Sequence, residues 1–261
     1  MISSNKNLHN SVLITGASGA IGSALARRYA APGVTLFLSC RDGEHLTGVA
    51  QECEQKGAKV YTRSLDVMDR VGCEEWIREA DQVCPLGMLF ANAGVSEGNT
   101  GCEDHERMRH IIDVNLIGVL NTVLPALSIM RKRNHGHIAV VSSIAGFRGI
   151  PMSPAYSTSK VAAKAFGEAL RPYLSEENVR VTVICPGYVS SPMTDENNFA
   201  MPFMVSTEKA AETIYRGMAR NKSRIVFPFP MHLAAWTLGA LPPALTDWLL
   251  TRVTKKRHSM R

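Results

Sequence analysis

The sequence lacks the cysteine and histidine patterns that mark metal sites and disulfide frameworks. Its six cysteines are scattered, no two of them form a C-x-x-C pair, and no cysteine–histidine cluster has the spacing of a zinc site. The sequence therefore predicts no metal. The thiols are expected to be reduced, as in a cytoplasmic protein.

Long hydrophobic runs and breaks in the chain are missing as well. Residues 1–10 are polar and lack the apolar core of a secretory signal. No run reaches the roughly 18 apolar residues expected of a membrane-spanning helix. No internal repeat, low-complexity segment or linker divides the 261 residues. We therefore expect one domain over residues 1–261, in which residues 228–261 form a C-terminal helical extension and basic tail.

Acidic residues are absent from the end of the chain. The whole chain has 29 Lys and Arg against 23 Asp and Glu, a net charge of +6, and residues 251–261 hold five of the basic residues and no acid. The rest of the chain is therefore nearly neutral. A nucleic-acid-binding protein would carry its basic residues on the folded surface, so this distribution argues against a nucleic-acid partner.

Short apolar runs alternate along the chain with longer segments of helical periodicity. Seven strands are expected at residues 12–14, 34–39, 58–65, 86–90, 137–141, 179–184 and 224–227. Helices are expected between them, and Asp69 is a candidate N-cap for the third helix. This alternation predicts an α/β fold with one parallel sheet covered by helices on both faces. Ligands of such sheets bind at the edge where the strands end.

The first expected strand runs into a glycine-rich turn, Thr15 to Gly22, and then into a helix. Glycines at 16, 19 and 22 let the backbone turn sharply and approach a phosphate, which the amides of the helix N-terminus can hold. The context of strand, turn and helix favours phosphate binding. A tight turn without a ligand is the alternative.

The second expected strand is followed by Cys40, Arg41 and Asp42. In dinucleotide-binding folds an acid at this strand end bonds the ribose of NAD, whereas an arginine accommodates the 2′-phosphate of NADP. The acid's position holds Cys40, and Arg41 is a permanently charged, planar group suited to phosphate. NADP is favoured over NAD. Alternatively, Arg41 is a solvated loop residue that Asp42 partly neutralises.

A tyrosine and a lysine stand four residues apart in the helix that follows the fifth strand. Tyr156 and Lys160 therefore share one helix face. A phenol beside an ammonium group is a proton donor of use near neutral pH. Taken alone, the pair could equally be part of an ordinary amphipathic helix.

Together these residues resemble the short-chain dehydrogenase/reductase family. The motifs that carry the resemblance are Thr15–Gly22, Asp66, Asn92-Ala93-Gly94, Asn115, Ser143, Tyr156-x-x-x-Lys160 and Pro186-Gly187. They stand in the family's order from Val12 to Val226. The resemblance implies a Rossmann-type doubly wound sheet and an oxidoreductase that interconverts a carbonyl and an alcohol.

The resemblance also implies catalytic roles. Tyr156 would be the general acid in reduction and the base in oxidation. Lys160 would favour the ionised form of Tyr156 and hold the nicotinamide ribose. Ser143 would hydrogen-bond the substrate oxygen, and Asn115 would bind a water that links Lys160 to solvent.

For the cofactor, the resemblance implies contacts from both halves of the chain. Arg41 would take the 2′-phosphate of NADP, and the other implied cofactor-binding residues are Gly16, Ser18, Gly19, Ala20, Ile21, Asp66, Val67, Asn92, Tyr156, Lys160, Val189 and Ser191. Three positions depart from the family's commoner pattern. Ala20 replaces a glycine, Gly19 stands where many NADP-dependent members carry a basic residue, and Ala91 replaces an asparagine.

The substrate side is less specific. The segments 94–96, 145–152 and 192–205 are expected to wall the pocket, and the last of these resembles a loop or lid with an apolar face. Candidate lining residues are Phe147, Ile150, Met152, Met193, Phe199, Met201, Phe203 and Met204. They suggest a small-molecule substrate that is apolar or bulky.

The C-terminal extension is open to two interpretations. It could pack over the pocket or against another subunit, or it could make a peripheral membrane contact through an apolar helix face and the basic tail. The resemblance implies a homodimer or homotetramer whose interface contains the helices around Asn115 and Tyr156.

Two other functions compete with the reductase. A sugar-nucleotide epimerase or dehydratase that retains its cofactor would also fit the glycine spacing, although the chain lacks a large C-terminal substrate domain. A non-catalytic NADP-sensing protein is the other, but it would not need both Tyr156 and Lys160.

Overall fold

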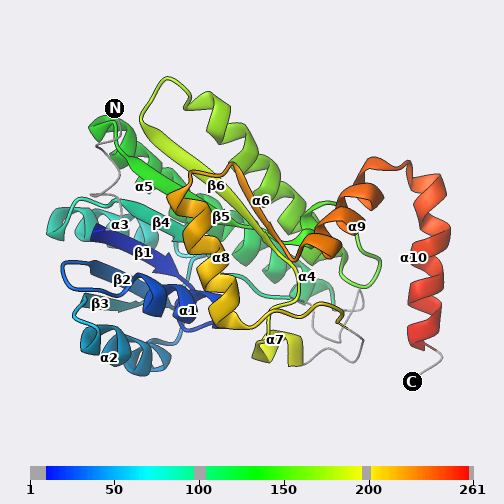
Figure 1. Cartoon of the computed structure of the whole chain (residues 1–261), viewed down its shortest axis with the longest axis horizontal. Coiled ribbons are helices and arrows are strands. Elements are labelled where there is room, and N and C mark those ends of the chain that lie inside the picture. Colours follow the sequence, from blue (N-terminus) through cyan, green and yellow to red (C-terminus); the bar gives the residue numbers. More distant parts are fainter. Residues whose placement is uncertain (1–9, 97–103, 196–200, 259–261) are drawn as a thin grey trace.

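The computed structural model describes residues 10–96, 104–195 and 201–258. Seven parallel strands form one sheet in the order β3-β2-β1-β4-β5-β6-β7 (Figure 1). The strands are β1 Ser11–Thr15, β2 Thr35–Cys40, β3 Lys59–Ser64, β4 Met88–Ala91, β5 Gly136–Val141, β6 Val179–Pro186 and β7 Arg224–Phe227. The order reverses direction beside β1, so the chain leaves β1 and β4 toward opposite faces of the sheet, and ligands of such folds bind at this point.

Helices cover both faces of the sheet, as the alternation predicts. They are α1 Ala20–Tyr29, α2 Thr47–Gln55, α3 Arg70–Val83, α4 His105–Ile112, α5 Gly118–Arg133, α6 Pro154–Tyr173, α7 Pro192–Asp195, α8 Thr207–Ala219, α9 Phe229–Ala240 and α10 Pro243–His258. One buried apolar cluster joins the sheet to α1, α2 and α8, and a second joins it to α3, α5 and α6. Strands β1 and β5 are buried along their whole length because both faces are covered.

Several predicted elements differ in detail from those observed. The helix expected between the second and third strands opens with a 3₁₀ turn, Gly43–Leu46, where the Asp42 carboxylate accepts from Glu44 N. Asp69 caps α3 by accepting from Gly72 N, which confirms its predicted role. The segment expected as a loop over 191–205 contains the short helix α7 and an isolated bridge between Val189 and Val205.

No continuous apolar run of membrane-spanning length was expected, but one helix of the structure is long and apolar enough to meet that criterion. Helices α4 and α5 are continuous through a π-helical turn, Asp113–Ile117, and form one helix over His105–Arg133. By length and composition alone this helix could cross a membrane, but half of its most apolar window is buried inside the fold. Its buried face packs against α3 and the sheet as a core helix does.

Candidate active site

The turn between β1 and α1 is shaped by close backbone contacts. Gly16 has φ +64, and a Cβ at this position would lie 2.8 Å from Ala93 Cα at the end of β4. Gly19 N donates to Gly16 O over 3.1 Å, which closes the turn. Among the described residues, no side chain caps the start of α1 and its first turn has no acid. Amides at 20–22 are therefore available to an anion.

Two polar side chains lock this turn to the end of β4. Thr15 Oγ1 donates to Phe90 O and accepts from the backbone amides of Asn92 and Ala93. Asn92 Nδ2 donates to Thr15 O over 2.9 Å and to Gly16 O over 3.1 Å. The predicted cofactor residues Gly16 and Asn92 are thus neighbours, brought together by the pairing of β1 with β4.

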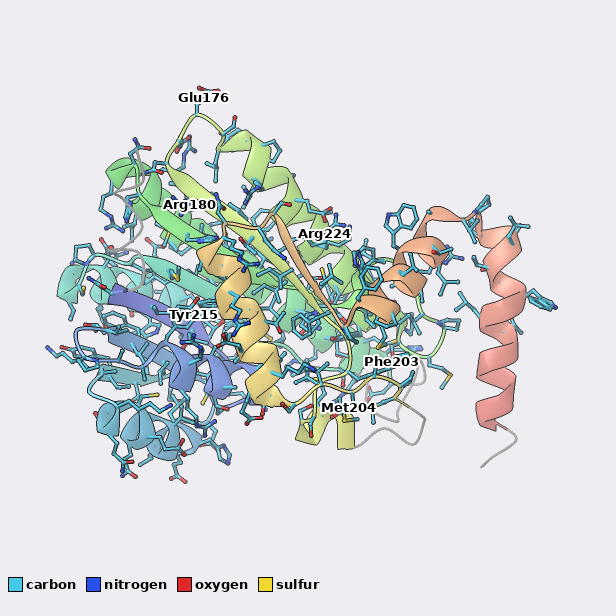
Figure 2. The ribbon with its side chains drawn as sticks, viewed as in Figure 1. Glu176, Arg180, Phe203, Met204, Tyr215 and Arg224 are labelled. Atoms are coloured by element: carbon cyan, nitrogen blue, oxygen red, sulfur yellow. The ribbon has the colours of Figure 1, made fainter. Side chains whose placement is uncertain are left out.

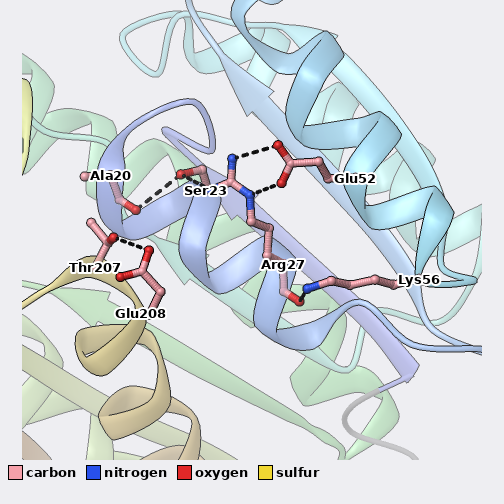
Figure 3. A network of polar contacts seen from close by, with 7 residues as sticks. All are labelled: Ala20, Ser23, Arg27, Glu52, Lys56, Thr207 and Glu208. Atoms are coloured by element: carbon pink, nitrogen blue, oxygen red, sulfur yellow. Dashed lines mark hydrogen bonds and ion pairs between the residues drawn. The ribbon is translucent and has the colours of Figure 1, made fainter.

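Helix α1 is held from its sides, which fixes the direction of its N-terminus (Figure 3). Arg27 forms a salt bridge with Glu52 on α2 and donates to Ser23 Oγ, which itself donates to Ala20 O. Lys56 Nζ donates to Arg27 O over 2.9 Å. The helix therefore has little freedom to tilt away from a bound phosphate.

Arg41 lies exposed just after β2, at the sheet edge beside this turn. Its carbonyl accepts from Ser64 Oγ over 2.8 Å, which ties its backbone to the end of β3. Among the described residues no ion pair joins Arg41 to Asp42, and the exposure of Arg41 also fits the alternative of a solvated loop residue. The Asp42 carboxylate accepts from Glu44 N and lies 3.3 Å from His45 Nδ1.

Asp66 and Val67 follow β3 at the same edge. Asp66 Oδ1 accepts from Met68 N over 2.9 Å, and Val67 is buried against α5, where a Cβ on Gly118 would lie 2.5 Å from Val67 Cγ2. Asn121 Nδ2 on α5 donates to Val67 O. The end of β3 is therefore rigid. The other predicted turn residues, Ser18, Ala20 and Ile21, follow β1, which is separated from β3 by β2 in the sheet.

Lys160 is buried beneath Tyr156. Its ammonium lies 5.6 Å from the centroid of the Tyr156 ring and donates to Val141 O over 3.1 Å. Burial lowers the pKa of Lys160 from 10.5 to about 8, because removal from water disfavours the charged form. A Cβ on Gly94 would lie 3.2 Å from Lys160 Nζ, so the Asn92-Ala93-Gly94 motif ends directly against the lysine.

Asn115 is fully buried in the π-helical turn that joins α4 to α5. Its side chain pairs with the backbone of Val95 in both directions: Nδ2 donates to Val95 O, and Oδ1 accepts from Val95 N. The second hydrogen of Nδ2 is donated to Ser159 Oγ over 3.1 Å. π-Helical turns of this kind often occur at functional sites.

Ser142 and Ser143 end β5 with different partners. Ser142 Oγ donates to Lys160 O over 2.7 Å and so fastens α6 to the strand. Ser143 Oγ accepts from Ala145 N over 3.1 Å and lies 3.5 Å from Pro186 O, a long contact. The loosely held hydroxyl is Ser143, which is the serine of the predicted site.

The segment after β6 is organised by Thr194. Thr194 Oγ1 lies 3.1 Å from Val189 O and 2.7 Å from Ser191 O, which share its single hydrogen, and it accepts from Ser191 N. Ser190 N donates to Val205 O, which closes the loop around α7. The predicted residues Val189 and Ser191 therefore lie in one compact turn at the C-terminal end of β6.

The predicted apolar lining divides into three groups. The Phe147 ring is packed between Lys164 and Arg224, each cation 5.3 Å from its centroid, so this side chain serves packing between α6 and β7. The exposed members are Ile150, Met193, Phe203 and Met204. Phe199 lies outside the described residues, and Met152 and Met201 are half-buried.

Sequence reasoning missed the side chains that position the expected ones. Ser159 and Ser142 hold Asn115 and α6, and Thr194 holds the turn after β6. The adjacent serine pair at the end of β5 was the one visible signal. For Ser159 and Thr194, nothing in the local pattern separates them from surface hydroxyls.

Comparison with known proteins identifies the family of the chain. A family model described as short chain dehydrogenase matches residues 10–201. An uncharacterized oxidoreductase of Myxococcus xanthus is 38% identical over 242 residues, which cover 92% of this chain and 95% of that protein. A dehydrogenase/reductase SDR family member 7B of Xenopus tropicalis is 29% identical over 266 residues, covering 94% and 86%.

Solved structures share the fold. A short-chain dehydrogenase/reductase from Burkholderia phymatum, in complex with NAD, has a TM-score of 0.79 at 24% identity and covers 89% of this chain and 93% of its own. A short-chain type dehydrogenase/reductase from Mycobacterium marinum has a TM-score of 0.74 at 25% identity, covering 86% and 97%. The family match spans most of the sheet and every predicted catalytic residue. The chain belongs to the short-chain dehydrogenase/reductase family of oxidoreductases.

Proposed function

We propose that the protein is an NADP(H)-preferring oxidoreductase that interconverts a carbonyl and an alcohol, with Tyr156 as the general acid and base. One observation carries this proposal: a buried Lys160 whose ammonium lies 5.6 Å from the Tyr156 ring, at the sheet edge where the glycine-rich turn opens. A structural lysine would be exposed or paired with an acid. Among the described residues, Lys160 forms no ion pair with a carboxylate; its ammonium donates to the backbone carbonyl of Val141.

A nicotinamide dinucleotide fits the residues at this edge. The amides of the turn, the glycine approach at Gly16 and the uncapped start of α1 suit its phosphates. When bound, the cofactor supplies or accepts the hydride. Because both hydrogens of Asn92 Nδ2 are used by Thr15 O and Gly16 O, a ribose contact from this side chain would use its carbonyl oxygen.

The protein's own groups then handle the proton. In reduction Tyr156 donates its phenolic proton to the substrate oxygen, while Ser143 Oγ donates a hydrogen bond to the same oxygen. The Lys160 cation stabilises the phenolate that remains. A positioned acid of this kind contributes roughly 10²- to 10⁴-fold in rate.

Lys160 can pass a proton onward because its pKa of about 8 lies near the working range. Both donors of the Asn115 side chain are used by Val95 O and Ser159 Oγ. We therefore assign the water contact of Asn115 to an oxygen of this residue rather than to its amide nitrogen.

NADP is preferred over NAD in this proposal because of Arg41. The guanidinium is exposed at the end of β2, and the neighbouring Asp42 carboxylate bonds Glu44 N and His45 instead. An unneutralised arginine at this position suits a 2′-phosphate and offers nothing comparable to a ribose hydroxyl.

The quaternary and cellular setting is also proposed. Ile117 and Leu124 on the π turn and α5, and Val161 on α6, are exposed apolar residues. They suit a homodimer or homotetramer interface of those helices. The five described cysteines are free thiols, which is consistent with a reducing, cytoplasmic compartment.

The test is Tyr156→Phe, assayed by NADPH oxidation over aldehydes, ketones, keto-acyl thioesters and steroids, with NADH in parallel. The hydroxyl is lost and the ring is kept, so turnover should fall at least about 10³-fold while NADPH binding, followed by fluorescence, is retained. Wild-type turnover by the variant on a substrate of the parent enzyme would refute the assigned mechanism.

A further inference from the structure

The last two helices form an arm that extends from one side of the molecule, with α10 at its edge (Figure 1). We call α9 and α10 together the C-terminal arm. None of the residues in α9 is buried. The arm is fastened to the segment after Ser143: a Cβ on Gly239 would lie 2.4 Å from Phe147 O, and Arg148 Nη2 bonds Thr246 Oγ1 and Asp247 Oδ1 at 2.9 Å each.

The arm exposes large apolar side chains to water. Trp236 is 55% exposed on α9, and Trp248 is 58% exposed on α10. The others are Phe229, Leu233, Leu241 and Leu245. A concentration of this kind is costly in water and marks a surface that contacts something else. Tryptophan is also the side chain most typical of the boundary between membrane and water.

The arm is too short to cross a bilayer. Its two helices are separated by Pro242, and α9, with 12 residues, is about 18 Å long, whereas a hydrocarbon core is about 30 Å thick. Asp247 on α10 is ion-paired to Arg148 on the body, so this part of the arm stays at the protein surface. Contact with a membrane would therefore be at the headgroup level.

Charge decides between a membrane and a second copy of the chain. Helix α10 continues to His258, and residues 251–261 carry Arg252, Lys255, Lys256, Arg257 and Arg261 with no acid. Two copies that met through this end would bring like charges together. The rest of the chain is nearly neutral, so it would not attract the basic end of another copy. A surface of anionic phospholipid supplies the opposite charge, worth roughly fivefold in binding for each basic residue near it.

Exposed apolar residues also lie on the proposed substrate side. Figure 1 shows β6 and β7 running toward the side from which the arm extends. Figure 2 shows the exposed Phe203 and Met204 at that same end of the sheet. We propose that the C-terminal arm binds the surface of an anionic membrane, with α9 and α10 at the headgroup level and the mouth of the site held close to the lipid.

The experiment is flotation of the full chain with vesicles of equal parts phosphatidylserine and phosphatidylcholine, and with phosphatidylcholine alone. The full chain should float with the anionic vesicles and much less with the neutral ones, and added salt should reduce the bound fraction. Lys255→Gln combined with Lys256→Gln should weaken binding about twentyfold. Trp236→Ala combined with Trp248→Ala should weaken it about tenfold or more.

Matched controls change the same chemistry elsewhere. Lys132→Gln with Lys209→Gln removes two exposed charges from other helices, and Val71→Asn removes an exposed apolar side chain from α3. Both controls should float like the parent. No flotation with anionic vesicles, or equal loss in the controls and the arm variants, would overturn the proposal.

Sedimentation velocity without lipid tests the remaining alternative, in which the arm contacts a second copy of the chain. The arm variants should sediment like the parent, because the proposed occupant is lipid. If the parent does not float, and if only the arm variants lose the oligomeric state of the parent, the surface binds a second copy of the chain. That outcome would also overturn the proposal. Retained NADPH binding by each variant shows that the fold and the proposed nucleotide site are intact, independently of the membrane result.

Discussion

The turn after β1 and the segment after β6 lie at the same edge of the sheet, yet they are held in different ways. The first is closed by backbone contacts: a Cβ on Gly22 would lie 2.3 Å from Gly16 O, and Asn92 bonds two carbonyls of the turn. The second is held by the hydroxyl of Thr194 and by a single backbone bridge from Val189 to Val205, and it leaves Met193 and Phe203 exposed.

This difference reflects two requirements. Binding of the cofactor phosphates needs a fixed backbone, whereas binding of a particular substrate needs suitable side chains. A phosphate-binding turn must present amides at fixed positions, and here close backbone packing and the side chains of Thr15 and Asn92 fix its shape. A substrate-binding segment can be changed by exchanging side chains around a loosely fixed backbone. Substitutions in the first region should therefore be far more damaging than those in the second.

The largest effect is expected from Gly22→Ala. The added methyl group would lie 2.3 Å from Gly16 O and 2.8 Å from Asn92 Nδ2, so the turn or α1 must move. We expect a loss of about 2–3 kcal/mol in unfolding free energy and a roughly hundredfold weaker affinity for NADPH, measured by urea unfolding and fluorescence titration.

Gly19→Ala is the matched control for that prediction. Gly19 has φ −70, and a Cβ there meets only Gly16 O, at 3.3 Å. Its effect should be at least tenfold smaller on affinity. Equal damage from the two substitutions would show that the close contact at Gly22 is not what shapes the turn.

Lys160→Met should abolish activity and at the same time raise the stability of the fold. The pKa of Lys160 is lowered from 10.5 to about 8, so burial of its charge destabilises the folded state fully below pH 8. Between pH 8 and 10.5 the unfolded chain binds more protons, and this cost disappears. We expect loss of turnover with a gain of about 1–3 kcal/mol in unfolding free energy at pH 7, partly offset by the lost bond to Val141 O.

The pH dependence is the diagnostic part of this prediction. Urea unfolding of both proteins at pH 7 and pH 9.5 should show the advantage of the methionine variant shrinking as the pH rises. An advantage that stays constant would mean that the buried ammonium does not carry the cost. Lys164→Met, at a half-buried lysine paired with Glu168, is the control and should lack the gain.

Arg41→Ser tests the cofactor side without touching the turn. The value of kcat/KM for NADPH should fall about 10- to 100-fold, because a charge-assisted contact with phosphate is removed. The value for NADH should change little, and the unfolding free energy should stay the same since the Arg41 side chain is exposed. A parent enzyme that prefers NADH would contradict the role given to Arg41.

The smallest effect is expected in the segment after β6. Thr194→Val keeps the size of the side chain but removes the hydroxyl that bonds Val189 O and Ser191 O. We expect about 1 kcal/mol of stability loss and a change in KM of roughly tenfold or less. Thr213→Val, at an exposed hydroxyl that bonds its own helix, is the control. A larger effect than that of Gly22→Ala would reverse the comparison of the two regions.

Local sequence was sufficient for the sheet and for the placement of several candidate site residues on their elements. The seven expected strands are all present in one parallel sheet, and the central ones are apolar because strands buried on both faces need continuous apolar side chains. The glycine-rich turn, Asp69 as a cap, and the placement of Tyr156 and Lys160 on one helix all follow from spacing along the chain. These features depend on neighbours a few residues apart, which a sequence records directly.

The contacts between distant segments were decided only by the tertiary structure. Lys160 bonds Val141 O, Asn115 bonds Val95 and Ser159, and Asp42 turns away from Arg41 toward His45. Each depends on which strands pair and how a helix is rotated against the sheet, and no local pattern contains that information. The same is true of the C-terminal arm, whose apolar residues could have been core but include none that is buried in α9, because this helix touches the described body only along one side.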